Sequence, residues 1–371
     1  MRAWMAFLGM LPACGFQSSP ALNNDANNDA PPDAPPTQFG SVIKVKFNSS
    51  SDIPTKSPTL TTDIDTDTSP LCDMHNDQDA KYCVIVGTSI AVASGMTLRA
   101  HGTKPLVLLA TDTFDLEGKI DVSSKHGDPK FGAGAKPPGS CLATTAAIGH
   151  SGGYGGSFGG AGGMGGTPVS TTGEAAGVPA PAITLPTELR GGCPGGDGAG
   201  NVGSAGSGGS GGGAVAIIAV TSIHLNGQIN ASGAGGLGGT GNGSGGGGGG
   251  GGSGGMIVLD APVIDAGAGP NVWLYANGGG GGQGGTASGA GSGAGDDGME
   301  SPDPTTQAPA GANINRSGGR GGSGSAGTIK DGDPATAAVN SGNGGSGGGG
   351  SGFIRSPAIA GAVFAPDRMS P

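Results

Sequence analysis

Short apolar runs separated by polar and glycine-containing turns dominate residues 40–124. We expect strands at residues 41–47 (SVIKVKF), 82–86 (YCVIV), 90–92 (IAV) and 106–109 (LVLL), which are rich in β-branched and aliphatic side chains and are separated by turns with Gly, Ser or Asp. No segment sustains the 3.6-residue apolar period of a helix. The pattern predicts an all-β protein without substantial helix, either an antiparallel sandwich or a parallel β-helix.

An internal repeat favours the parallel arrangement. Residues 105–124 (PLVLLATDTFDLEGKIDVSS) align without gaps on residues 214–233 (AVAIIAVTSIHLNGQINASG). A weaker copy spans 256–278, and residues 353–355 open a fourth. A repeated strand–turn–strand unit that cannot bury its apolar face alone is the signature of a solenoid. We therefore expect parallel β-helix or β-solenoid-like rungs.

Glycine makes up 86 of the 371 residues and is concentrated in long tracts, without the strict repeat of collagen. Within residues 152–167 a period of three is legible, which a three-fold left-handed helix without internal hydrogen bonds would produce. We expect such polyglycine II-like helices to pack beside the rungs, with disorder of some tracts as the rival interpretation. The tracts are residues 152–167, 203–213, 233–255, 278–295 and 342–352.

The first residues read as an export signal. A short apolar stretch ends in Leu11-Pro12-Ala13, and the following Cys14 stands where bacterial lipoproteins receive their lipid. We expect Cys14 to be lipidated and the protein to be anchored to the membrane at the outer membrane or cell surface. Simple signal-peptide cleavage, or a misassigned start codon, is the alternative.

The chain divides into four parts on composition. After the signal peptide and lipobox at 1–14, residues 15–39 are rich in Asn, Asp and Pro and predict a disordered tether. Residues 40–149 form an N-terminal β-rich solenoid part. Residues 150–371 form a glycine-rich repeat part.

The four remaining cysteines are Cys72, Cys83, Cys141 and Cys193. An even set in an exported chain predicts two disulfides. Three pairings are possible, and sequence order favours Cys72 with Cys83 and Cys141 with Cys193. Free buried thiols are the alternative.

Composition excludes several partners. A net charge of −10 with 12% charged residues and no basic cluster predicts that the protein does not bind nucleic acid. Alternating Asp63, Asp65 and Asp67 lack the glycine and glutamate of an EF-hand, and residues 195–201 (GGDGAGN) carry a single glycine–aspartate turn. We expect no metal and no cofactor.

Catalytic constellations are absent from the sequence, so no catalytic residue is assigned. The histidines show no paired metal-ligand spacing and are interpreted as solvated turn positions; they are His75, His101, His126, His150 and His224. One modest charged cluster is present, for which outward solvation is the preferred explanation. It comprises Asp112, Asp115, Asp121 and Lys119.

The strand-and-turn segments resemble those of uncharacterised glycine-rich lipoproteins of myxobacteria and related bacteria, which are loosely similar to the PE-PGRS proteins of mycobacteria. The resemblance is carried by residues 104–108 (KPLVL), 118–123 (GKIDVS), 227–233 (GQINASG) and 254–262 (GGMIVLDAP). The mycobacterial N-terminal helical domain is lacking. The resemblance implies the fold and the surface location, and it names no site residue.

The tether, the disulfides and the lack of a recognisable catalytic site together predict a non-catalytic structural or adhesive surface protein that contacts glycans or other cell-surface proteins. Four aromatic side chains are candidates for stacking on sugar rings: Tyr154, Phe158, Trp273 and Tyr275. Of these, Trp273 and Tyr275 are expected to pack in the core. The alternative function is a β-helix lyase or hydrolase acting on extracellular polysaccharide.

Overall fold

The computed structural model describes residues 37–135, 141–169, 173–241, 245–267, 272–286, 293–339, 342–356 and 369–370. The predicted leader, Cys14 and most of the tether lie outside the described residues. Residues Pro36–Pro371 form one compact unit, as judged by the contacts within it. Within the described part, no helix is long and apolar enough to cross a membrane.

The protein is an all-β chain with three parallel sheets and one 3-10 turn, η1 (Ser50–Asp52), in its described part. The five-stranded sheet contains β4 (Cys83–Gly87), β7 (Leu106–Ala110), β10 (Ala214–Ala219), β13 (Met256–Asp260) and β16 (Phe353–Arg355). The four-stranded sheet contains β5 (Ile90–Val92), β8 (Thr113–Leu116), β11 (Ser222–Leu225) and β14 (Val263–Ala266). The six-stranded sheet contains β3 (Asp63–Asp65), β6 (Thr97–His101), β9 (Lys119–Asp121), β12 (Gln228–Asn230), β15 (Trp273–Tyr275) and β17 (Met369–Ser370).

The chain visits the three sheets in a fixed order. From β4 to β15 it passes repeatedly through the five-stranded, the four-stranded and the six-stranded sheet, one strand in each. We call such a trio of strands a circuit. Each strand pairs in parallel with its counterpart in the next circuit, as Leu106 with Val215 and Lys119 with Gln228. These pairs are the ones that the sequence repeat aligns, so the repeat predicted the register correctly.

Mainly aliphatic side chains fill the interior between the three sheets. Buried residues from all three sheets form one cluster that includes Ile85, Leu108, Phe114, Ile120 and Ile217. Because successive strand residues point to opposite faces, one set of side chains fills this interior and the alternate set faces outward.

Strands of the five-stranded sheet are also buried on their outer face. Val107, Leu109 and Ile218 belong to a second apolar cluster that is covered by residues near the N-terminus, among them Phe39 and Phe47. A strand buried on both faces reads as a continuous apolar run rather than an alternating one. This burial explains the uninterrupted runs at residues 106–110 and 214–219.

The N-terminal segment that covers the five-stranded sheet differs from the prediction in one strand. Residues 41–47 were expected to run as a single strand, but only β2 (Val45–Lys46) is extended, and it pairs in antiparallel fashion with β1 (Gln38–Phe39). The Asp260 carboxylate at the end of β13 accepts hydrogen bonds from the backbone N–H groups of Ser41 and Val42, at 2.5 and 2.9 Å. The segment therefore closes over the five-stranded sheet instead of adding a strand to it.

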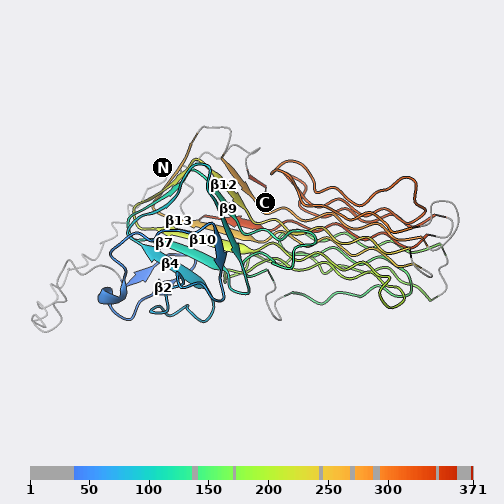
Figure 1. Cartoon of the computed structure of the whole chain (residues 1–371), viewed down its shortest axis with the longest axis horizontal. Coiled ribbons are helices and arrows are strands. Elements are labelled where there is room, and N and C mark those ends of the chain that lie inside the picture. The colour runs from blue at the N-terminus through green and yellow to red at the C-terminus, as the bar shows by residue number, and fades with distance from the viewer. Residues whose placement is uncertain are drawn as a thin grey trace, which may run out of the picture. The chain divides into compact units, whose positions relative to one another are not determined.

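Glycine tracts form excursions between circuits (Figure 1). They leave after β9, β12 and β15 and return before β10, β13 and β16, and in Figure 1 they run side by side away from the sheets. Hydrogen bonds between the tracts recur every third residue: the N–H groups of Gly206, Gly209 and Gly212 donate to the carbonyls of Gly247, Gly250 and Ser253. The period of three that the sequence indicates is present in this bonding.

The central tract, residues 247–255, is bonded in three directions in turn. The N–H of Gly247 donates to Ala199, that of Gly248 to Gly344, and that of Gly249 to Leu237, and this order repeats over the next six residues. Carbonyls of the same tract accept from three further segments. The donor and acceptor neighbours together are residues 193–199, 231–237, 344–350, 153–156, 206–212 and 279–282.

Candidate functional site

The structure joins Cys72 to Cys83 and Cys141 to Cys193. The predicted disulfides are confirmed, in the pairing that sequence order favours. Disulfides of this kind are typical of extracellular or other oxidising environments. The Arg190 guanidinium lies beside the second disulfide, with its Nη2 3.2 Å from the Cys193 sulfur, and 4.7 Å from the centre of the Phe158 ring.

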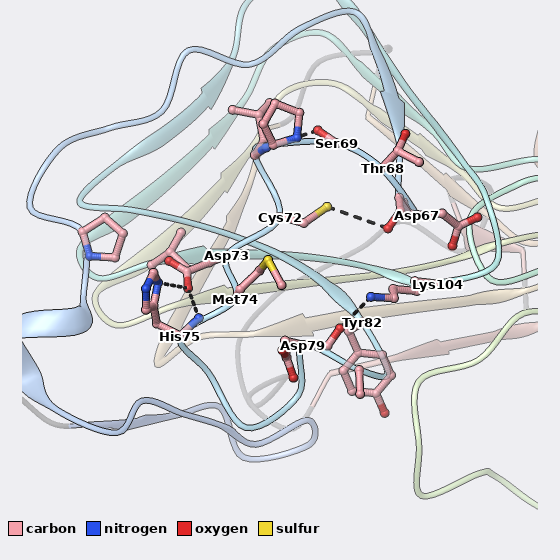
Figure 2. A pocket seen from close by; sticks show the side chains of 16 residues that line it. Asp67, Thr68, Ser69, Cys72, Asp73, Met74, His75, Asp79, Tyr82 and Lys104 are labelled. Carbon is pink, nitrogen blue, oxygen red and sulfur yellow. Dashed lines mark hydrogen bonds and ion pairs between the residues drawn. The ribbon is translucent and has the colours of Figure 1, made fainter.

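A pocket of about 660 Å³ lies beside the first disulfide (Figure 2). The loop between β3 and β4, including Tyr82, forms much of its wall, and Pro54, Val86 and Lys104 complete it. Figure 2 shows Asp73 with His75 on one side of the pocket and Tyr82 with Lys104 on the other. The Cys72–Cys83 bond ties the loop to β4, which fixes the wall relative to the sheet.

Most charged groups of this pocket are already engaged. The Asp67 carboxylate accepts hydrogen bonds from the backbone and hydroxyl of Thr103, and Asp73 accepts from the backbone N–H of His75 at 2.6 Å. The Lys104 ammonium donates to the carbonyl of Asp79 at 2.7 Å. The pocket offers hydrogen bonds to a small polar ligand, but it presents no nucleophile activated by a base within the described residues.

A second polar cluster lies on the outer face of the six-stranded sheet. The carboxylate of Asp121, 3% exposed, accepts a hydrogen bond from Ser123 and lies 3.3 Å from the Lys125 ammonium and 3.7 Å from Arg99. Burial by itself raises the pKa of Asp121, but the Ser123 hydrogen bond and the charges of Lys119, Lys125 and Arg99 outweigh it and lower that pKa below its usual value. Arg99 also donates a hydrogen bond to the carbonyl of Ser123 and forms an ion pair with Asp128. The cluster therefore fixes the segment that follows β9 against the six-stranded sheet.

The charged cluster noted in the sequence is not assembled. Asp112 follows β7, Asp115 lies on β8 of the four-stranded sheet, and Asp121 lies on β9 of the six-stranded sheet. Of the other three members of this cluster, only Lys119 acts electrostatically on Asp121. Outward solvation, the preferred explanation, is wrong for Asp121, because its carboxylate is buried among cations.

The prediction of solvated turn positions is wrong for two of the histidines, whereas His75 is exposed in the loop between β3 and β4. His101 lies on β6 and His224 on β11, and both approach carboxylates: His101 Nε2 is 3.3 Å from Asp63, and His224 Nδ1 is 3.7 Å from Asp265. Parallel pairing of strands from distant parts of the chain brings these groups together. No pattern within one strand could have indicated the contact.

Ser222 Oγ lies 2.9 Å from His224 Nε2, so Ser222, His224 and Asp265 follow the order of contacts of a nucleophile–base–acid relay. The side chains of His224 and Asp265 are 40% and 71% exposed. A relay depends on a shielded, preorganised environment, which water at both groups removes. These residues form a hydrogen-bonded row on the sheet surface.

The two calcium motifs weighed in the sequence serve other contacts. Asp63 pairs with Lys130 at 3.0 Å, and Asp65 accepts from the N–H of Asp67. Asp197 accepts from the N–H of Gly208, one tract away. Among the described residues, no group of three or more His, Cys, Asp or Glu side chains is placed to hold a metal ion.

Comparisons with known proteins find no match to this chain among family models, curated proteins or solved structures.

Proposed function

We propose that the protein is a non-catalytic structural or adhesive module of the cell surface, built as a parallel β-solenoid that carries polyglycine II helices. The observation that carries the proposal is the hydrogen bonding of residues 247–255 to six neighbouring segments. Ordering glycine costs more backbone entropy than ordering any other residue. A chain that places long glycine tracts in one hydrogen-bonded bundle gains rigidity there and few side chains for chemistry.

Surface location is the second part of the proposal. The disulfides favour an exported protein, and the Leu11-Pro12-Ala13-Cys14 sequence favours a lipid anchor on Cys14. Residues 15–39 then act as the tether between membrane and module. The resemblance to glycine-rich myxobacterial lipoproteins fits this arrangement. The proposed partners are surface glycans or other cell-surface proteins, and not nucleic acid.

Display on the outer membrane of a bacterial host tests the proposal. We expect cells that display the wild-type chain to be retained on polysaccharide-coated or cell-coated surfaces at least several-fold more than cells without it. The variant Cys14→Ser should lose retention because the folded protein leaves the membrane. Equal retention with and without the displayed protein would contradict the adhesive role, and release of sugar fragments from the coating would favour the carbohydrate-active enzyme.

A further inference from the structure

A row of side chains crosses the outer face of the six-stranded sheet near one end of its strands. Leu98, Ile120, Ile229 and Leu274 lie in the interior cluster, so the residues that precede them point outward. These outward residues are aligned by the parallel register, one per circuit: Thr97, Lys119, Gln228 and Trp273. Neighbouring strands are about 4.8 Å apart, so the row offers a linear series of contacts.

Trp273 is the aromatic side chain in this row, and its expected place in the core is wrong. Leu274 fills the interior, whereas Trp273 points outward and is only partly buried. Two of the other candidate rings for sugar stacking are buried, because Phe158 is 0% and Tyr275 is 2% exposed. Tyr154 is partly buried like Trp273, but its ring packs over Gly196. An indole held on a rigid strand at the surface is suited to stacking on an amphipathic ring.

A hollow of about 280 Å³ adjoins the row. Its lining includes Met96, Glu117, Lys119 and Gln228, together with the turn glycines of three circuits. The side chains of Glu117, Lys119 and Gln228 form no hydrogen bond with other described residues, and the charge of Lys119 acts on the nearby Asp121. An amide, a carboxylate and an ammonium therefore face one hollow with their hydrogen-bonding capacity unused, next to the partly buried indole of Trp273.

We propose that this row, Lys119–Gln228–Trp273 with Glu117, binds a linear neutral oligosaccharide. The apolar face of one pyranose ring stacks on Trp273, and hydroxyls of the next rings bond to Gln228, Lys119 and Glu117. Side chains one strand apart match successive units of an extended sugar chain. The net charge of −10 and the presence of Glu117 disfavour a polyanionic ligand. This inference rests on the proposed adhesive function and names its ligand class.

The two tryptophans of the chain are Trp4, in the predicted leader, and Trp273. In the chain from residue 14 onward, carrying Cys14→Ser, the fluorescence of Trp273 therefore reports on the site alone. We expect saturable changes in emission on titration with cellohexaose or chitohexaose, and none with hexagalacturonate. Unchanged emission with both neutral sugars, or tighter binding of hexagalacturonate, would overturn the proposal.

Calorimetry of variants locates the binding site. Trp273→Ala and Gln228→Ala should each weaken neutral-sugar binding at least tenfold, whereas Val263→Ala, an exposed residue on the four-stranded sheet, should leave it unchanged. Full affinity in both of the first two variants would overturn the site.

If Trp273→Ala loses sugar binding while displayed cells remain attached, the adhesive function stands through another surface. If soluble sugar binds the wild type and displayed cells do not attach, the site stands and the adhesive role fails.

Discussion

At the residue scale, the absence of a side chain decides which neighbours a glycine can have. A Cβ built on Gly209 would lie 2.2 Å from the carbonyl oxygen of Ala234, and one built on Gly250 would lie 1.8 Å from that of Tyr154. Backbones of adjacent tracts therefore approach as closely as hydrogen bonding allows, which no other residue permits at these positions. Ser253 fits into the tract because its hydroxyl oxygen accepts a hydrogen bond from the backbone N–H of Cys193.

Substitution at Gly209 tests this close packing. We expect Gly209→Ala to lower the free energy of unfolding by about 1–3 kcal/mol, the cost of forcing extra atoms into a packed interior. Ser207→Ala is the matched control, because Ser207 is exposed two residues away in the same tract. Denaturant unfolding measures both, and equal stabilities of the two variants would argue against a packed bundle.

At the element scale, β9 shows how one strand serves two environments. Ile120 contributes to the apolar interior, and Asp121 turns outward into the cluster of Arg99, Ser123 and Lys125. The carboxylate is buried yet charged, because cations and a hydroxyl donor replace the water it loses. Alternation along the strand thus places a stabilising ionic contact directly beside the core.

The lowered pKa of Asp121 predicts an acid-sensitive contribution to stability. A carboxyl group whose pKa is lower when folded stabilises the protein above its unfolded pKa, about 3.9, and that contribution disappears as pH falls below this value. We expect Asp121→Asn to cost about 1–3 kcal/mol at pH 7 and to flatten the loss of stability below about pH 4. Unfolding curves at several pH values measure this, with Asp115→Asn on the neighbouring sheet as control; equal pH dependence in both variants would contradict the assignment.

At the scale of the whole molecule, the glycine excursions and the sheets belong to one hydrogen-bonded unit. Each excursion starts and ends on a strand of a circuit, and Gly213 and Gly255 pass directly into β10 and β13. The tracts are therefore fixed at both ends by elements with an apolar core. Unfolding of the sheets should release the tracts as well, because their positions depend on the strands.

Amide hydrogen exchange measures this coupling. We expect the amides of residues 247–255 to exchange on the slow timescale of β10, because nine consecutive N–H groups in this tract are bonded. Exchange should accelerate together in tract and strand as denaturant is added. Immediate exchange of the tract with a protected β10 would mean that the glycine segments are disordered spacers on a smaller β-domain.

Much of the strand arrangement follows from local sequence. The repeat of residues 105–124 at 214–233 anticipates the pairing of Leu106 with Val215, because parallel stacking places equivalent residues side by side. The first circuit, β4 to β6, could not be aligned without gaps on the next circuit, because the spacing between paired residues varies from 22 to 24. The pairs Thr97–Lys119 and Ile90–Phe114 show this variation. Bonded segments outside the predicted tracts include residues 193–199 and 332–338, which contain fewer glycines, and the glycine-rich residues 317–325.

The sequence by itself determined the strands, the register of the main repeat, the period of three in the glycine tracts and the favoured disulfide pairing, since each depends on spacing along the chain. Only the tertiary structure decided which tract lies beside which, and that Trp273 faces outward. Glycine amides are chemically alike and carry no side chain that could specify a neighbour. Their partners are set by where each excursion leaves the sheets. The outward direction of Trp273 is set by which face of β15 meets the core.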